Sequence, residues 1–293
     1  MDIRVLKYFL AAAREGNITK AADVLHVTQP TLSRQLMDLE RELGTALFDR
    51  GKRSVSLTPE GLLFRQRAEE VYGLWDKTKR DMAAFTGITG GTVSIGCVET
   101  AASLLLPGVI EAFHSQYPAV RYEIYSANGD GIRGKIDCGR IDMGILAEPA
   151  ETAKYDHIHL PCKDTWGVFM PAADPLAKKK NLRVNDLAGL PLFVPWRNIV
   201  VDEIESWAGA EGKNLNILGY NNLMTNTLPL IERGLGYAVC VEGALSIRPH
   251  GNIRFVPFYP KRTSGHVLVW KKNKVFSRAG ELFLEHIKTV LQD

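Results

Sequence analysis

The chain has 293 residues, of which 45% are hydrophobic, and its formal net charge at pH 7 is +3. This length allows two domains with hydrophobic cores, and the composition is typical of a globular protein. The small net charge does not by itself indicate a nucleic-acid partner, and the absence of any apolar run of roughly 20 residues excludes a membrane-spanning helix.

The N-terminal residues predict two helices and a sharp turn. The chain opens directly into a helix over Met1–Arg14, without the basic and apolar regions of a signal peptide, so we expect a cytoplasmic protein. A second helix is predicted over Thr19–Leu25, and His26–Thr28 is short enough only for a sharp turn. Apolar residues at helical spacing give both helices one inward face: Val5, Leu6, Phe9, Leu10, Ala13, Ala21, Ala22 and Leu25.

A third helix follows with a polar N-terminal surface. Thr28 is suited to cap its start, and Pro30 falls in the first turn, where a missing N–H costs little. The predicted buried stripe consists of Leu32, Leu36, Leu39 and Leu43. The residues off this stripe near the N-terminus are Gln29, Thr31, Ser33 and Arg34.

These side chains suit the reading of DNA. A recognition helix places its N-terminal residues at base edges in the major groove, where Gln pairs with adenine, Arg with guanine, and Ser or Thr with bases or phosphates. The alternative is an ordinary helical hairpin with a solvated face. The next segment favours DNA, because residues 46–58 predict a β-hairpin whose basic tip, Arg50–Arg53, suits a minor groove or phosphates.

A long helix is predicted after the hairpin. Thr58-Pro59-Glu60 is a typical helix start. Apolar positions then alternate by four and three residues, as in a seam between two helices: Phe64, Ala68, Val71, Trp75, Thr78, Met82 and Phe85. A long core helix is the alternative, but the charged residues between the seam positions favour a partner helix. Residues 87–91 predict a flexible hinge.

The N-terminal segment resembles the LysR-type transcriptional regulators. The resemblance is carried by Phe9, Ala21-Ala22, Leu25, Gln29-Pro30-Thr31-Leu32-Ser33, Leu39-Glu40, Leu43-Gly44, Leu47-Phe48-Asp49-Arg50 and Leu57-Thr58-Pro59-Glu60-Gly61. It implies that Gln29, Pro30, Thr31, Ser33, Arg34 and the wing residue Arg53 approach DNA, with Lys20, Thr28 and Thr58 near phosphates. It also implies a double-stranded inverted-repeat operator and a homodimer or homotetramer, and leaves RNA polymerase open as a further partner.

The second half alternates strands with helices, which predicts an α/β domain. Strands are expected at 92–97, 120–126, 165–170, 192–194, 215–219, 237–240 and 267–270. Helices are expected at 104–116, 132–138, from 201, at 225–233 and at 278–291. The segments Leu105-Leu106-Pro107, Gly139-x-Ile141-Asp142-x-Gly144-Ile145 and Gly234-Leu235-Gly236-Tyr237 resemble the family's effector-binding domain, a two-lobed fold like periplasmic solute-binding proteins.

The predicted organisation is therefore a winged helix-turn-helix domain at 1–58, a linker helix at 59–86, a hinge at 87–91 and an effector-binding domain at 92–293. Lobe I is expected at about 92–161 and 267–293, and lobe II at about 162–266. This organisation predicts a ligand-switched regulator. The alternative is a solute-binding module without specific DNA recognition.

Other motifs in the sequence carry less weight. The string Gly129-x-Gly131-x-x-Gly134 is followed by a helix too short for a dinucleotide-binding fold. His157-x-His159-x-x-Cys162 is interpreted as two outward histidines and a buried thiol rather than a metal site. Cys97, Cys138, Cys162 and Cys240 lack a Cys-x-x-Cys pair and are expected to be core thiols. We expect no cofactor, and no Gly-x-Ser-x-Gly or His-Glu-x-x-His motif indicates an enzyme.

The effector is expected between the lobes, where strands end at helix N-termini. The candidate residues are Thr100, Ala101, Ser103, Asn128, Gly129, Trp196, Arg197, Asn198, Thr225 and Asn226. Free N–H groups, hydroxyls and the Arg197 guanidinium favour an anionic ligand such as a small carboxylate. Glu99 beside this loop argues against an anionic ligand, since an inward carboxylate repels an anion.

Overall fold

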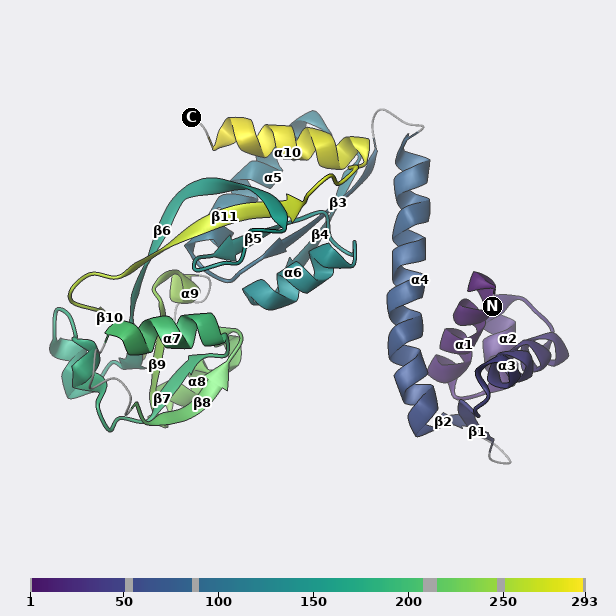
Figure 1. Ribbon diagram of the computed structural model, residues 1–293, viewed down its shortest axis with the longest axis horizontal. Helices are drawn as coiled ribbons and strands as arrows, with labels where there is room; N and C mark the ends of the chain where they lie inside the picture. Colours follow the sequence, from purple (N-terminus) through teal and green to yellow (C-terminus); the bar gives the residue numbers. More distant parts are fainter. Residues whose placement is uncertain (1, 51–54, 86–89, 208–214, 247–250, 292–293) are drawn as a thin grey trace. The chain divides into compact units, whose positions relative to one another are not determined.

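The computed structural model describes residues 2–50, 55–85, 90–207, 215–246 and 251–291 (Figure 1). The chain divides into two compact units, Met1–Arg80 and Asp81–Asp293. Each unit has its own hydrophobic core, so the fold of each follows from its own residues.

The first unit begins with three short helices, α1 (Ile3–Glu15), α2 (Ile18–Leu25) and α3 (Gln29–Leu43). Each starts at a side-chain cap, provided by Asp2, Asn17 and Thr28, as is typical of helix N-termini. Their apolar faces meet in one core around Phe9, which is fully buried. The helical pattern predicted from the sequence is therefore confirmed, with boundaries shifted by one or two residues.

The predicted apolar stripes are mostly buried. Leu32, Leu36 and Leu39 are at most 2% exposed, as are Ala21 and Ala22. Leu43 was expected to complete the stripe, but it is 43% exposed because it lies in the last turn of α3, outside the core cluster. Leu10, Ala13 and Leu25 are half-buried at the edge of the core.

A small antiparallel hairpin follows, formed by β1 (Phe48–Arg50) and β2 (Val55–Leu57), with Phe48 paired to Leu57 and Arg50 to Val55. The predicted strands of the wing are thus confirmed. Its tip, including Arg53, lies outside the described residues.

The long helix α4 runs from Pro59 to Phe85. Its first turns pack onto the helical core through Phe64, Ala68 and Tyr72. Further along, Val71, Trp75 and Met82 are 49%, 42% and 58% exposed. The predicted seam therefore has two parts, of which the first covers the chain's own core and the second is solvent-exposed. The Phe85 side chain and residues 87–89 of the predicted hinge lie outside the described residues, and Gly91 already belongs to a strand.

The second unit is built on a mixed sheet of nine strands among the described residues, and its strands form two regions. The first region contains the adjacent strands β4 (Val120–Ser126), β3 (Gly91–Cys97), β5 (Met143–Ala147) and β11 (Thr263–Lys271). The second contains β9 (Tyr237–Val241), β7 (Leu192–Pro195) and β8 (Ile217–Asn221). The long strand β6 (Tyr155–Pro171) joins the two and also pairs with β10 (Ile253–Pro257).

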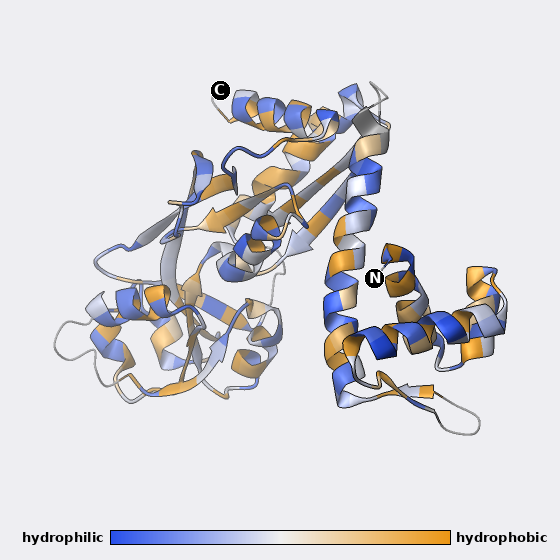
Figure 2. Ribbon diagram, turned by 45° about the vertical axis from the view of Figure 1, so that its right-hand side comes forward, coloured by the Kyte–Doolittle hydropathy of each residue, from blue (hydrophilic) through white to orange (hydrophobic). Residues whose placement is uncertain are grey.

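Helices cover both regions of the sheet. Lobe I carries η1 (Ala101–Leu104), α5 (Leu105–Gln116), α6 (Gly129–Asp137) and α10 (Arg278–Val290). Lobe II carries η2 (Pro175–Lys178), η3 (Val184–Leu187), α7 (Asn198–Trp207), η5 (Met224–Asn226), α8 (Leu228–Glu232) and α9 (Gly243–Ser246). Hydrophilic and hydrophobic residues both recur along α10 (Figure 2), and its apolar face, with Phe283 and Ile287, is buried in the lobe I core. The predicted α/β, two-lobed class is confirmed.

Several predicted elements differ in extent. The strand expected at 165–170 begins at Tyr155, because its first half pairs with β11 even though His157 and His159 are exposed there. The helix expected at 225–233 is divided into η5 and α8. The expected helices at 132 and 201 start earlier, at Gly129 and Asn198. The predicted lobe boundaries, 161/162 and 266/267, fall within β6 and β11.

Candidate functional site

The start of α3 is an exposed polar surface. His26 ends α2 in the left-handed conformation, at φ 56°, which turns the chain sharply toward α3. The Thr28 hydroxyl accepts a 3.4 Å hydrogen bond from the Thr31 N–H and lies 2.7 Å from the Thr31 hydroxyl. The predicted cap is therefore formed, and it fixes the first turn of the helix.

The structure brings most of the sequence-predicted DNA-contacting residues to this end of α3. Gln29, Pro30, Thr31 and Arg34 are exposed, whereas Ser33 is half-buried. Lys20 and Thr28 are also exposed. The arrangement leaves an amide, a guanidinium and hydroxyls accessible on one helix end, as base and phosphate recognition requires.

Thr58 caps the start of α4, as the Thr58-Pro59-Glu60 pattern predicts, and its position near a phosphate stays a prediction. Its hydroxyl donates its single proton to the Ala46 carbonyl oxygen, at 2.8 Å, and accepts a hydrogen bond from the Gly61 N–H, at 2.9 Å. Thr58 therefore caps α4. Gly61 is needed beside it, because a Cβ there would lie 2.0 Å from the Leu47 carbonyl oxygen.

Glu40 was not singled out as a functional residue from the sequence. One of its carboxylate oxygens accepts hydrogen bonds from the N–H groups of Leu47 and Phe48, at 2.9 and 3.0 Å. These bonds join the C-terminal half of α3 to the first strand of the wing. Glu40 therefore positions the wing relative to the recognition helix.

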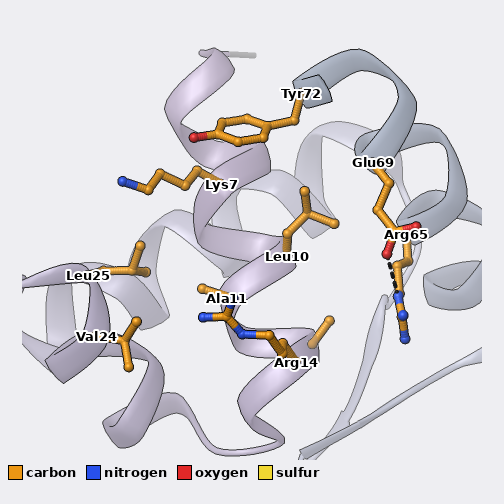
Figure 3. A pocket seen from close by; sticks show the side chains of 10 residues that line it. Lys7, Leu10, Ala11, Arg14, Val24, Leu25, Arg65, Glu69 and Tyr72 are labelled. Atoms are coloured by element: carbon orange, nitrogen blue, oxygen red, sulfur yellow. Dashed lines mark hydrogen bonds and ion pairs between the residues drawn. The ribbon is translucent and has the colours of Figure 1, made fainter. Parts of the chain in front are cut away.

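A hollow of about 550 Å³ lies between α1, α2 and α4 of the first unit (Figure 3). Lys7, Arg14 and Arg65 bring basic groups to it, and Val24 and Tyr72 contribute apolar surface. Arg65 is paired with Glu69, at 2.8 Å. The lining contains none of the predicted DNA-contacting residues, so this hollow is separate from that surface.

The second unit contains a cavity of about 110 Å³ between its two lobes. Lobe I contributes the ends of β3, β4 and β5 with the residues that follow them, including Glu99, Thr100, Asn128, Gly129 and Glu148. Lobe II contributes Trp166, Arg197, Asn221, Met224 and Cys240, among others. The cavity therefore lies where strand ends of both lobes meet, as the fold predicts for a ligand site.

Four of the ten candidate effector residues line this cavity: Thr100, Asn128, Gly129 and Arg197. Six do not: Ala101, Ser103, Trp196, Asn198, Thr225 and Asn226. Trp196 is 68% exposed, and Asn198 is also exposed. Ser103 makes a local hydrogen bond to the Val98 carbonyl, at 2.7 Å, and Thr225 donates to the cavity-lining Glu99 at 2.9 Å.

Arg197 joins the two lobes. Its Nε donates to Asp130 on α6, at 3.1 Å, and its Nη1 donates to the Pro149 carbonyl oxygen, also at 3.1 Å. The side chain is only 10% exposed and passes directly over Gly129, where a Cβ would lie 3.3 Å from Nη1. The guanidinium is therefore held by the protein itself.

A buried ionic cluster lies behind Thr100. Asp164 accepts hydrogen bonds from the N–H groups of Ala101, at 2.9 Å, and Gly243, at 2.8 Å. His266 lies 3.3 Å from the same carboxylate and 2.8 Å from the Thr100 hydroxyl, and its side chain is completely buried. Burial by itself lowers the pKa of His266, but hydrogen bonds to Asp164 and Cys162 outweigh it and raise that pKa to about 9.

The sequence contained little to identify Asp164 and His266. They stand on different strands, β6 and β11, which become neighbours only in the folded sheet. Their cluster ties η1 of lobe I to α9 of lobe II at the crossing strands.

The cysteines are only partly core residues. Cys97 is buried, and burial raises the pKa of its thiol to about 11. Cys240 borders the cavity, and burial raises its thiol pKa to about 12. Cys138 was expected in the core but is exposed, because it follows the last turn of α6. No group of three potential metal-ligating side chains occurs within the described part of the chain.

The fold and these two sites define a class of protein that combines a winged helix-turn-helix domain with a two-lobed ligand-binding domain. Two family models match the chain: the bacterial regulatory helix-turn-helix protein of the lysR family at residues 3–62, and the LysR substrate binding domain at residues 87–292. The chain therefore belongs to the LysR family of transcriptional regulators.

Individual relatives cover nearly the whole chain. The uncharacterized HTH-type transcriptional regulator YybE of Bacillus subtilis is 27% identical over 98% of this chain and 98% of its own length. The Hca operon transcriptional activator HcaR of Escherichia coli is 29% identical over 94% of this chain and 93% of its own. Both similarities include the DNA-binding and ligand-binding parts.

Solved structures agree with the fold. Full-length CbnR complexed with its target DNA superposes with a TM-score of 0.74 at 23% identity, over 99% of both chains. Full-length BenM superposes with a TM-score of 0.55 at 27% identity, over 99% of this chain and 96% of that chain. The chain is thus a DNA-binding transcriptional regulator with an effector-binding domain, rather than a solute-binding module with an incidental helical domain.

No helix within the described ranges is long and apolar enough to cross a membrane.

Proposed function

We propose that the chain recognises an inverted-repeat operator through the N-terminal end of α3. Gln29, Thr31, Ser33 and Arg34 contact base edges, and Pro30 packs against the groove beside them. Lys20, Thr28 and Thr58 lie near phosphates, and Arg53 of the wing enters the minor groove. The exposed surface at the start of α3 carries this proposal, since it presents an amide and a guanidinium where a recognition helix meets bases.

The operator's symmetry requires two copies of the chain. The second part of the α4 seam, with Val71, Trp75 and Met82, exposes apolar side chains that a partner helix would cover. We therefore propose a homodimer through α4, and a homotetramer where two dimers bind neighbouring half-sites. RNA polymerase is the partner through which such a complex would alter transcription.

The cavity between the lobes is the proposed effector site. A ligand there touches Thr100, Asn128 and Gly129 of lobe I and Arg197 of lobe II, so its binding favours one arrangement of the lobes over another. The Asp164–His266 cluster lies behind Thr100 and connects both lobes. Ligand occupancy thereby changes the packing of subunits on DNA.

We further infer that the chain is not an enzyme and that it acts in the cytoplasm, where the DNA it regulates is found. The cavity-lining thiol, Cys240, has a pKa raised by burial to about 12, so it is not an activated nucleophile. Binding without turnover suffices for a regulator.

The Arg34→Ala variant tests the recognition surface. We expect loss of about 1–3 kcal/mol of binding free energy at the specific operator and relaxed base preference, with the fold intact because Arg34 is exposed. Arg41→Ala is the matched control, since Arg41 is an exposed arginine in the last turn of α3, paired with Asp38. Unchanged specific binding of Arg34→Ala in a salt-controlled titration contradicts the assignment.

A further inference from the structure

Two uncharged donor groups border the effector cavity and lack an acceptor. One is the side-chain amide of Asn221, the last residue of β8 in lobe II. Its Nδ2 is buried and has no hydrogen-bond partner within the described part of the chain. A buried amide donor without an acceptor is costly, and a ligand atom that accepts its hydrogen bond would remove that cost.

The second donor is the Thr100 hydroxyl of lobe I. Its oxygen lies 2.8 Å from His266 Nε2 and accepts a hydrogen bond from the Ala102 N–H, at 3.4 Å. His266 Nε2 also lies 3.3 Å from the Asp164 carboxylate, and its Nδ1 lies 3.3 Å from the Cys162 carbonyl oxygen. Both of these acceptors require a hydrogen on the ring nitrogen that faces them.

The Thr100 hydroxyl therefore keeps its own proton for another partner. A protonated Nε2 has no lone pair, so it cannot accept a hydrogen bond from the Thr100 hydroxyl. Burial lowers the pKa of His266, but hydrogen bonds to Asp164 and Cys162 outweigh it, so both ring nitrogens stay protonated at neutral pH. Thr100 lines the cavity, and no acceptor for its hydroxyl occurs among the residues that the structure describes.

The cationic side chain on the cavity lining is engaged by the protein itself. Arg197 donates to Asp130, which also pairs with Arg133, and Arg133 pairs with Glu151. The two arginines and the two acids compensate one another's charge. Arg197 therefore offers little net positive charge to a ligand.

The helix starts beside the cavity are engaged as well. The Ala101 N–H of η1 donates to the Asp164 carboxylate, and the Gly131 N–H of α6 donates to the Asn128 side chain. The unpaired hydroxyl and amide, by contrast, carry no charge and suit an uncharged acceptor. A buried carboxylate would need a charge partner in addition to these donors.

We propose that the effector is a small uncharged carbonyl compound whose oxygen accepts hydrogen bonds from Thr100 of lobe I and Asn221 of lobe II. This inference rests on the proposed function of the cavity and specifies the ligand class. A carbonyl oxygen has a lone pair for each of the two donors. The cavity of about 110 Å³ limits the body of the ligand, since roughly 150 Å³ suffices for benzene in a protein interior.

Matched probes that share a body and differ in the polar group test the proposal. The panel consists of propanamide, propanoate and n-propylamine, with cyclopropanecarboxamide, cyclopropanecarboxylate and cyclopropylmethylamine as the cyclic set. The shift in thermal unfolding of the effector domain is measured in the full chain, at equal millimolar concentrations and constant ionic strength. The amides are expected to give the largest stabilisation in each set.

Asn221→Leu removes the unpaired donor and keeps a side chain of similar shape. Since Nδ2 has no partner among the described residues, the ligand-free variant should unfold at the original temperature or above it. Its amide affinity should fall about tenfold or more. A merely structural Asn221 would give the opposite result, a lower unfolding temperature with unchanged amide affinity.

Asn216→Leu is the matched control. Asn216 is exposed, precedes β8 outside the cavity, and its Nδ2 donates to the Gly189 carbonyl oxygen at 3.2 Å. This variant should bind amides as the original chain does.

Two substitutions of Thr100 isolate the role of its hydroxyl. Thr100→Val should weaken amide affinity about tenfold or more, whereas Thr100→Ser, which keeps the hydroxyl, should retain it. Greater stabilisation by the carboxylates or amines overturns the proposal. Amide binding that is undetectable for both amides, or unchanged in Asn221→Leu or Thr100→Val, also overturns it. Operator recognition is measured on the same preparation, so the proposed regulator function can stand while this ligand class fails.

Discussion

The Asp164–His266 pair makes the stability of the effector domain depend on pH. The pKa of His266 rises from an ordinary value of 6.5 to about 9 in the folded chain. The folded state therefore holds the proton more tightly than the unfolded state does. This contribution to stability is fully present below pH 6.5 and is lost as pH rises through about 9.

The size of the effect follows from the same difference. A pKa raised from 6.5 to about 9 corresponds to about 3 kcal/mol of unfolding free energy. Solvent does not screen the interaction between the two side chains, because the His266 side chain is 0% exposed and that of Asp164 is 3% exposed. Burial raises the pKa values of the Cys97 and Cys240 thiols from 9.0 to about 11 and 12. These thiols affect the free energy of unfolding only from about pH 9 upward.

Urea denaturation followed by tryptophan fluorescence measures this contribution. Trp166 lies in the core of lobe II and reports on unfolding of the effector domain. The free energy of unfolding should fall by about 3 kcal/mol as pH rises from about 6.5 to about 9, and His266→Asn should remove most of that slope. His157→Asn, at an exposed histidine on β6, is the control. A slope that is identical in His266→Asn and the original chain would refute the reasoning.

Two further predictions concern the first unit and its long helix. Leu36→Ala removes a side chain that is 1% exposed in the helical core. It should destabilise the DNA-binding domain by about 2–5 kcal/mol, as measured by thermal unfolding. A loss below about 1 kcal/mol contradicts the core assignment. Val71→Pro interrupts α4 at an exposed seam position and should abolish the dimer in analytical ultracentrifugation. A surviving dimer contradicts the proposed seam. The control Arg67→Ala, outside the seam, should leave the dimer intact.

The sequence predicted the first unit well because its signals are local. Helix caps such as Thr28 and the spacing of Leu32, Leu36 and Leu39 depend on neighbours within a few residues, and the structure contains both. Leu43 was the exception, since its burial depended on where the covering helices end. Helical periodicity alone does not predict where those covering helices end.

The cavity was harder to predict because its residues are assembled from distant segments. The rule that ligands bind at strand ends found Thr100, Asn128, Gly129 and Arg197. It did not predict that Arg197 would be paired with Asp130, nor that Glu148 would border the same cavity. Asp164 on β6 and His266 on β11 come together in the fold, although the two strands are far apart in the sequence. Long-range pairing of this kind leaves no periodic signal in one sequence.

The expected carboxylate ligand stays a prediction, and its sequence basis considers each group separately. Helix starts and Arg197 favour an anion when each is considered by itself, as the sequence requires. In the folded chain, the Ala101 N–H donates to Asp164, the Gly131 N–H to Asn128, and the Arg197 Nε to Asp130. The partners of a charged group, rather than its presence, decide which ligand it can bind.

Selection of genomic DNA fragments by the purified chain tests sequence-specific recognition most directly. Fragments retained at moderate salt are sequenced, and the selection is repeated at higher salt to separate specific contacts from phosphate contacts. We expect a shared inverted repeat whose recovery persists as salt rises and is lost with Arg34→Ala. Retention without a shared motif, vanishing as salt rises, would contradict sequence-specific recognition by α3.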